Sequence, residues 1–194
     1  LCLLPCLAWA EEGKPLYAVK DENGLWGYID CKGKLVIPGM FTWAEDFRGN
    51  YALARLIPEG EPVEEYGYFG IIDASGQWVL PPAYYDVLSV SDSGDWANGR
   101  DAGIYYIVDG WKKGSKAGFF DIPSGFFSGL IYDHVDIEWT EHTDSEYIGV
   151  TMDGKLGFVR RTTGEIVIPC QYTPDDSRDF CGDSCMVMPY ETKV

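Results

Sequence analysis

A short pattern returns four times along this chain of 194 residues. Each copy has an aromatic or aliphatic residue followed by glycine, then a turn glycine six or seven residues later, then an apolar run. The leading glycines are Gly27, Gly70, Gly118 and Gly157, which lie 43, 48 and 39 residues apart. Self-similarity at a period of this size predicts a tandem repeat array rather than a single closed enzyme core.

Each copy predicts a β-hairpin. In the first copy a strand at 26–30 leads into a turn with Gly33, and the next strand stops at Pro38, which has no amide hydrogen for a ladder. In copies three and four one extra residue precedes the turn glycine, which predicts a longer loop or a bulge. The recurring motif residues are Trp26, Gly27, Asp30, Gly33 and Pro38, then Phe69, Gly70, Asp73, Gly76 and Pro81, then Gly118, Asp121 and Gly125, then Gly157, Gly164 and Pro169.

Two positions of the motif have a clear physical interpretation. Glycine inside a strand is costly unless another backbone or ring must come close, so the leading glycine indicates a packing contact repeated in every copy. The aspartate directly before the turn is expected to accept hydrogen bonds from loop amides, a role far commoner at this place than catalysis.

The composition favours an all-β fold. Aromatic residues make up 15% of the chain, which also has 23 Gly and 11 Pro, and this mixture is typical of many short strands joined by tight turns. A lone hairpin is marginal in water, so we expect a tandem array of antiparallel hairpin or three-strand repeats that cover one another. An open, solenoid-like array is favoured, and a propeller-like arrangement is the alternative.

The pattern also divides the chain. We assign 1–10 to the remnant of a signal peptide and 11–194 to a repeat domain. Its copies span about 14–58, 59–88, 104–140 and 145–194. The polar segment 89–103 is expected to be an inserted loop; such insertions often contribute to binding, although a tolerated surface insertion is the simpler interpretation. Trp26 is the seventh residue after Val19, and Val194 is the seventh after Val187, so a fifth copy is expected to open after Val194.

The first ten residues are apolar and end in Ala8-Trp9-Ala10, directly before Glu11. This ending has the small-x-small form of a signal-peptidase site, and ten residues are too few to span a bilayer. We therefore predict cleavage after Ala10 and a secreted or cell-surface protein with no transmembrane span. A lipoprotein signal at Cys6 is the rival interpretation, but Pro5 fits a lipidation box poorly.

The net charge of −16 bears on partners. Nucleic acid and anionic membranes need clustered Lys and Arg, so neither is an expected partner. A cationic partner, or a partner without charge, fits better. Acidity also has a simpler explanation, because it keeps an exported protein soluble.

The cysteines suggest disulfide chemistry rather than a metal site. In an exported chain an even number of cysteines indicates disulfides, and Cys181 and Cys185 flank a loop short enough for a possible bridge. The two histidines lack the spacing of zinc ligands. No metal and no cofactor are predicted.

The sequence contains no motif of a nucleophile elbow, a zinc protease, a P-loop or a dinucleotide site, so no catalytic residues are assigned. Its acidic clusters are interpreted as solvated faces and turns. Trp26, Trp43 and Trp78 recur with the pattern and are expected to pack in the core. Three tryptophans lie off the pattern and are candidates for surface binding: Trp96, Trp111 and Trp139.

The motif of Trp-Gly, an aromatic residue, Ile-Asp, a turn glycine and an apolar run ending in Ile-Pro resembles that of bacterial WG-repeat proteins. The resemblance covers most of residues 14–194 and is weakest in copy three, where Ala117 replaces the tryptophan and the proline is missing. It implies an extracytoplasmic or surface-associated repeat scaffold and implies no catalytic residues.

We therefore expect an exported, non-catalytic scaffold that binds a protein or a cell-wall component of unknown identity. A carbohydrate-binding module that uses exposed tryptophans is the alternative. A glycoside hydrolase with paired carboxylates is an outside possibility, because the sequence alone places no two carboxylates across a cleft.

Overall fold

The computed structural model describes residues 15–58, 60, 68–91, 101–136 and 146–173. These residues form strands and turns only, so the all-β expectation is confirmed. No helix that could cross a membrane occurs among them. The chain divides into two compact units, Leu1–Tyr84 and Tyr85–Val194.

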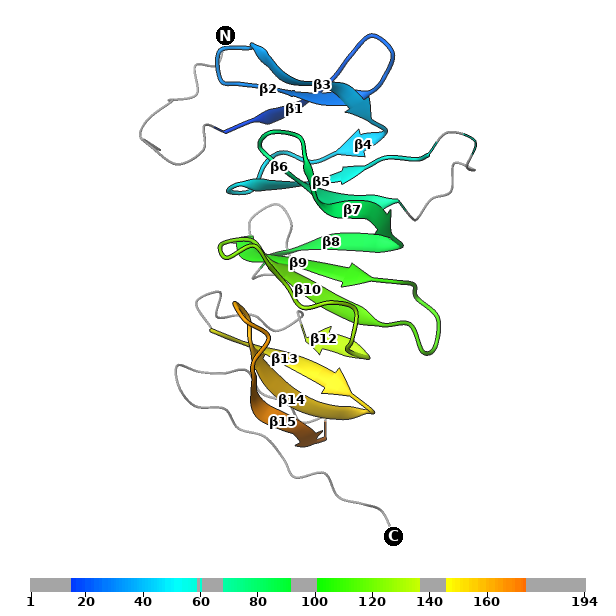
Figure 1. Cartoon of the computed structure of the whole chain (residues 1–194), viewed down its shortest axis with the longest axis vertical. Coiled ribbons are helices and arrows are strands. Elements are labelled where there is room, and N and C mark those ends of the chain that lie inside the picture. The colour runs from blue at the N-terminus through cyan, green and yellow to red at the C-terminus, as the bar shows by residue number, and fades with distance from the viewer. Residues whose placement is uncertain (1–14, 59, 61–67, 92–100, 137–145, 174–194) are drawn as a thin grey trace. The chain divides into compact units, whose positions relative to one another are not determined.

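Unit 1 contains two antiparallel sheets, of order β1-β2-β3 and β4-β5-β6-β7 (Figure 1). Strands that follow each other in sequence are neighbours in each sheet, so both are simple meanders. The strands are β1 Tyr17–Lys20, β2 Trp26–Ile29, β3 Leu35–Phe41, β4 Trp43–Ala44, β5 Tyr51–Arg55, β6 Phe69–Asp73 and β7 Trp78–Tyr84.

Unit 2 repeats this plan with sheets of order β8-β9-β10-β11 and β12-β13-β14-β15. All neighbouring strands in it are antiparallel. The strands are β8 Asp86–Ser91, β9 Asp101–Val108, β10 Ala117–Asp121, β11 Phe126–Phe127, β12 His134–Asp136, β13 Tyr147–Met152, β14 Lys155–Arg160 and β15 Ile166–Tyr172.

Sequence copies and sheets are out of phase. In unit 1 the first copy supplies β2 and β3, which complete one sheet, and then β4 and β5, which begin the next. The second copy enters that same sheet with β6 and β7. The first copy therefore links two sheets covalently, and the third does the same in unit 2, where it contributes β10 and β11 to one sheet and β12 to the next. Three of the four sheets also have one strand more than the three expected per repeat.

The core of unit 1 lies between its two sheets and pairs large residues with small ones. Tyr28 and Phe41 of the first sheet are fully buried, and they face Ala52 and Ala54 of the second. The alanines allow the second sheet to approach the aromatic rings closely. The hydroxyl of Tyr28 donates a hydrogen bond of 2.8 Å to the carbonyl oxygen of Glu45, so burial leaves this polar group satisfied.

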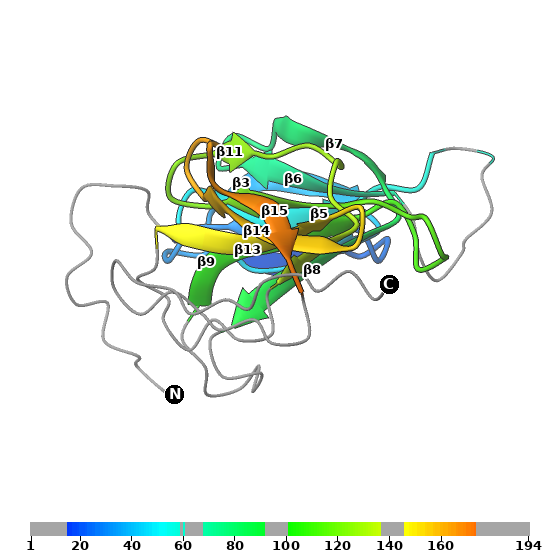
Figure 2. The ribbon, with the colours of Figure 1, turned by 90° about the horizontal axis from the view of Figure 1, so that it is seen from below.

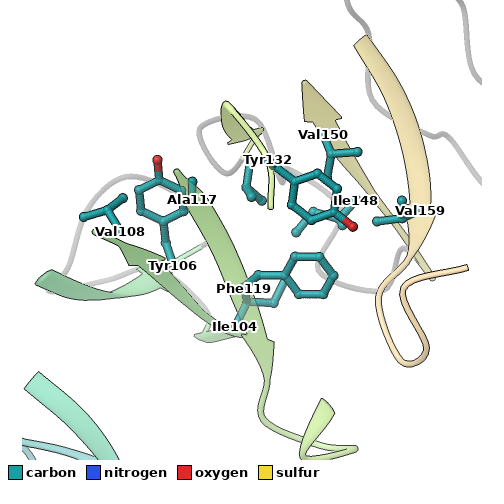
Figure 3. Packing of buried hydrophobic residues seen from close by; sticks show 10 residues of the cluster. Ile104, Tyr106, Val108, Ala117, Phe119, Tyr132, Ile148, Val150 and Val159 are labelled. Atoms are coloured by element: carbon teal, nitrogen blue, oxygen red, sulfur yellow. The ribbon is translucent and has the colours of Figure 1, made fainter. Parts of the chain in front are cut away.

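The core of unit 2 has the same character (Figure 3). Phe119 stacks on Tyr132, with ring centroids 6.4 Å apart and planes 11° from parallel. The remaining members come from both sheets of the unit: Ile104, Tyr106, Val108, Ala117, Val135, Ile148, Val150 and Val159. In both units the two sheets bury their apolar faces against each other.

The last described sheet is apolar on both faces. Val159 of β14 belongs to the core of unit 2, whereas the alternate residues Leu156 and Phe158 form a separate buried cluster. Tyr147, Ile168 and Tyr172 pack against that cluster. Both faces of this sheet therefore contribute buried apolar residues.

A buried ion pair joins the two sheets of unit 2. Arg161, in the turn after β14, places its Nε 2.5 Å from Oδ1 of Asp121, at the end of β10. The side chains are 12% and 1% exposed. Arg161 also donates to the carbonyl oxygen of Gly103 at 3.1 Å, and Ser124 donates to Asp121 through both its backbone N–H and its hydroxyl. The carboxylate therefore has partners that compensate for its burial.

The inserted segment is shorter than expected. Residues 89–91 belong to β8 and residues 101–103 to β9, and Ser91 pairs with Asp101 across the hairpin. These residues were assigned to a loop, but a strand ladder is made by backbone N–H and C=O groups, so it can extend whatever the side chains where two strands already run side by side. Residues 92–100, between the strands, lie outside the described residues.

We predict that Asp121→Ala lowers the free energy of unfolding by about 3 kcal/mol, because it leaves the Arg161 guanidinium buried without its carboxylate. Urea denaturation followed by tryptophan fluorescence measures the change. Asp30→Ala is the matched control, since Asp30 has the same place in copy one but lies at the surface. An equal loss in the two variants would contradict a special role for the buried pair.

Candidate interaction surface

The first two motif turns are built in the same way. The N–H of Gly33 donates to the carbonyl oxygen of Asp30 at 2.9 Å, and the N–H of Gly76 donates to that of Asp73, also at 2.9 Å. Each aspartate carboxylate accepts two more backbone N–H groups from its own loop. Both glycines have positive φ, 78° and 84°, a conformation that glycine adopts without a steric penalty.

These hydrogen bonds stabilise the ionised aspartates. Backbone N–H groups of Lys34 and Lys32 lower the pKa of Asp30. At Asp73 partial burial acts in the opposite direction, but hydrogen bonds from the Ser75 hydroxyl and from the loop amides outweigh it, and the pKa is again lowered. The carboxylates of Asp30 and Asp73 are thus engaged within their own turns.

The turns of copies three and four are one residue longer. Gly125 donates to the carbonyl oxygen of Asp121 at 2.8 Å, and Gly164 donates to that of Arg160 at 2.7 Å, each four residues back instead of three. Arg160 replaces the aspartate, so the fourth turn closes without a side-chain carboxylate at this position. The extra residue is thus absorbed in the turn.

The leading glycines lie against the backbone of the next strand. A Cβ atom placed on Gly27, Gly70 or Gly157 would lie 2.5, 2.5 or 2.6 Å from the carbonyl oxygen of Ile37, Leu80 or Ile168, respectively. Gly118 meets the carbonyl oxygen of Gly129 in the same way. No side chain fits at these four positions unless the neighbouring backbone moves.

The close approach results from a bulge with the same register in the copies. Trp26 pairs with Phe41, and Tyr28 pairs with Ile37. A step of two residues along β2 therefore corresponds to a step of four residues along β3, and the two extra residues of β3 form the bulge. The same two-against-four register occurs between β6 and β7 and between β14 and β15. The motif prolines lie in these bulges and are exposed; they are Pro38, Pro81 and Pro169. Since proline lacks an N–H, it fits where the ladder is interrupted.

Members of the apolar runs differ in burial, and exposed aliphatic side chains lie near the start of β3, β7 and β15. Leu35 and Val36 on β3 are 56% and 44% exposed, and Ile166 and Val167 on β15 are 59% and 39% exposed. Val79, at the matching place on β7, is also exposed. All three strands are outer strands of their sheets. The sequence analysis did not single these residues out, because an apolar run alone does not reveal which members are buried.

These outer strands lie on the same side of each unit. In unit 1 the turn glycine before β7, Gly76, lies against Ile37 of β3, and in unit 2 Gly164, before β15, lies against Phe126 of β11. Figure 2 shows β3 and β7 along one side of unit 1, and β11 and β15 along one side of unit 2. We call the exposed residues Leu35, Val36 and Val79 of unit 1, with Ile166 and Val167 of unit 2, the aliphatic edge.

The tryptophans fall into two groups. Trp43 and Trp78 are half-buried, and their rings meet those of Phe69 and Phe41 at centroid distances of 5.9 and 5.5 Å. Trp26 is also half-buried, with Nζ of Lys20 5.2 Å from its ring centroid. Trp111 is 55% exposed. The other two surface candidates, Trp96 and Trp139, lie outside the described residues.

The geometry of the described residues bears on a metal site and on the predicted disulfide. They contain no group of three or more His, Cys, Asp or Glu side chains arranged to hold a metal ion. Cys31 is exposed and Cys170 is half-buried, both as free thiols, and burial raises the pKa of Cys170. Cys181 and Cys185 lie outside the described residues, so their disulfide stays a prediction.

Comparison with known proteins identifies the motif. The family model described as "WG containing repeat" matches residues 26–56 and 69–97. The matches begin at Trp26 and Phe69, the first residues of β2 and β6. No curated protein and no solved structure gives a significant match.

We predict that Gly27→Ala destabilises the protein by about 2 kcal/mol, because the added methyl group would displace the bulged backbone of β3. Thermal unfolding followed by circular dichroism measures the loss. Gly33→Asn is the control, since a Cβ at Gly33 meets nothing within 4 Å and asparagine tolerates positive φ. If the two variants had the same melting temperature, the close approach at Gly27 would not explain the loss of stability.

Proposed function

Because this chain carries WG repeats, we propose that it is an exported, non-catalytic scaffold that binds a protein or a cell-wall component. The aliphatic edge supports the proposal most directly. Apolar side chains on an outer strand are a liability in water, and a surface of this kind is characteristic of a strand that receives a partner.

The geometry of the edge favours an extended protein segment as the occupant. An outer strand has a row of backbone N–H and C=O groups on its free side, with which an added strand can pair. At β3 this row is accompanied by Leu35 and Val36 and is interrupted at Pro38. The segment available for pairing is thus short, so the side chains of the partner must contribute much of the affinity.

Repetition compensates for a short contact. Each unit has two outer strands on one side. When a partner has bound one of them, the second contact is intramolecular and forms at a high effective concentration, so two short contacts together give a higher affinity than either alone. The net charge of −16 favours partner segments that are neutral or basic. An extended, apolar segment with few acidic residues therefore fits best.

Export is supported by the sequence of residues 1–10. Its apolar run, the small-x-small ending at Ala10 and the charged residues that follow together fit a signal-peptidase site. A repeat scaffold that acts outside the cytoplasm would meet wall components and surface proteins directly.

A second function, carbohydrate binding, is favoured by Trp111. Its indole ring is 55% exposed, whereas Trp26, Trp43 and Trp78 are half-buried. Exposed aromatic rings offer a flat apolar face together with a polar N–H, which suits the mixed surface of a sugar.

We predict that the double variant Leu35→Lys, Val36→Lys weakens binding of extended apolar peptides about tenfold or more, since it places two charges on the aliphatic edge. Peptides of twelve residues selected against the purified chain by phage display provide the probes, and fluorescence polarisation gives their affinities. Stability should change little, because both residues are exposed.

Tyr17→Lys is the matched control for that experiment. Tyr17 is 45% exposed on β1, the opposite outer strand of the same sheet. Peptide binding that survives in Tyr17→Lys and fails in the double variant would support the aliphatic edge. Failure to select any peptide, or equal losses in the two variants, would refute it.

We also predict that the natural protein, recovered from the cells that make it, begins at Glu11. Mass spectrometry of the intact N-terminal peptide tests this. A mature protein that starts with a lipid-modified Cys6 would establish the rival lipoprotein signal, and a cytoplasmic protein that retains residues 1–10 would contradict export altogether.

A further inference from the structure

The loop between β9 and β10, residues 109–116, concentrates positive charge in an acidic chain (Figure 1). It contains three of the 15 Lys and Arg residues: Lys112, Lys113 and Lys116. Lys116 is paired, with its Nζ 2.6 Å from Oδ1 of Asp133. Lys112 and Lys113 are exposed, and the part of the chain that the structure describes contains no ion pair to either of them.

Hydrogen bonds hold this loop in one shape. The N–H of Asp109 donates to the carbonyl oxygen of Lys116 at 3.1 Å, and the N–H of Lys116 donates to Oδ1 of Asp109 at 2.6 Å. Inside this closure Ser115 donates to the carbonyl oxygen of Lys112 at 3.0 Å, and Gly114 has a φ of 90°. The backbone below the two free lysines is therefore fixed before any ligand arrives, which reduces the entropic cost of binding.

Trp111 lies beside the two lysines and is anchored from below. Its ring centroid is 6.3 Å from that of Tyr106, a residue only 5% exposed. Asp86, 7% exposed, lies near this side chain, and its interaction with Trp111 partly offsets the rise that burial causes in the pKa of Asp86. With Tyr106 against one side of the indole, the exposed part remains available to a ligand.

We propose that Trp111, Lys112 and Lys113 form a binding site for an acidic polysaccharide. A sugar ring stacks on the exposed part of Trp111, and a carboxylate, sulfate or phosphate group of the same polymer pairs with Lys112 and Lys113. This site does not depend on peptide binding at the aliphatic edge, and it specifies the charge of the sugar, which an exposed tryptophan alone does not.

The charge distribution favours an acidic polysaccharide over other anionic partners. Binding to an anionic membrane surface takes clusters of about four to eight basic residues. Only two unpaired lysines are present in this loop, and the chain as a whole carries a net charge of −16, which repels both a membrane and nucleic acid. A short stretch of sugar needs only a local contact, and at physiological salt the repulsion from distant acidic groups is screened.

Binding of carboxymethyl dextran, polygalacturonate and hyaluronan to the full chain tests the proposal, with unmodified dextran as the neutral probe. Isothermal titration calorimetry gives the affinities at low and high salt. We expect acidic polymers to bind and dextran to bind at least about tenfold more weakly. Binding should weaken further as sodium chloride is raised, because the lysines are exposed.

The variants separate the two parts of the site. Trp111→Ala and the double variant Lys112→Ala, Lys113→Ala should each lose about tenfold or more in affinity for the acidic polymers. The double variant Lys32→Ala, Lys34→Ala is the matched control, since it removes two exposed lysines from another turn and should bind normally. Circular dichroism confirms that each variant is folded.

The proposal is overturned if no acidic polymer binds, if dextran binds as well as carboxymethyl dextran, or if Lys32→Ala, Lys34→Ala loses as much affinity as Lys112→Ala, Lys113→Ala. Binding to phosphatidylglycerol vesicles without binding to the polysaccharides also overturns it, in favour of a membrane contact. Should Trp111→Ala prove unfolded, Trp111→Leu replaces it, and an unchanged affinity in a folded Trp111→Leu variant would exclude stacking and overturn the proposal.

Discussion

The structure of copies one, two and four depends on the close approach between a glycine and the backbone of the strand that follows it. The hydrogen atom at the Cα of Gly27 or Gly70 occupies a place where a Cβ would lie 2.5 Å from a carbonyl oxygen. This contact allows four residues of the second strand to lie opposite two of the first. The bulge sets the strand register, and the register determines which side chains enter the core.

The second constraint is that no sheet is sufficient alone. A copy of the motif supplies the last strands of one sheet and the first strands of the next, and the aromatic residues of one sheet are buried by small residues of its neighbour. Hydrophobic burial and chain connectivity therefore act on the same pair of sheets. The Asp121–Arg161 pair adds a polar link between the sheets of unit 2, and its partners offset the cost of burying the charges.

The surfaces proposed for binding lie where this repeated architecture leaves side chains uncovered. The aliphatic edge follows from the bulge, because the residues just before it sit on an outer strand whose free side faces solvent. The loop at 109–116 belongs to no motif position, and its lysines stand out against an acidic chain. The aliphatic edge is thus repeated and apolar, whereas the loop at 109–116 occurs once and is basic. The two surfaces therefore suit different ligands.

The all-β class, the turn positions and the longer turns of copies three and four could be predicted from the sequence, because glycine, proline and aspartate act locally on the backbone. The sequence did not determine that β8 and β9 extend into the segment 89–103, since ladder formation depends on the partner strand. It also missed the exposure of Leu35, Val36, Ile166 and Val167, because an apolar run has the same letters whether it faces a neighbouring sheet or water. Whether an apolar side chain is buried depends on whether another sheet packs over it, and this is set by the packing of the sheets in three dimensions.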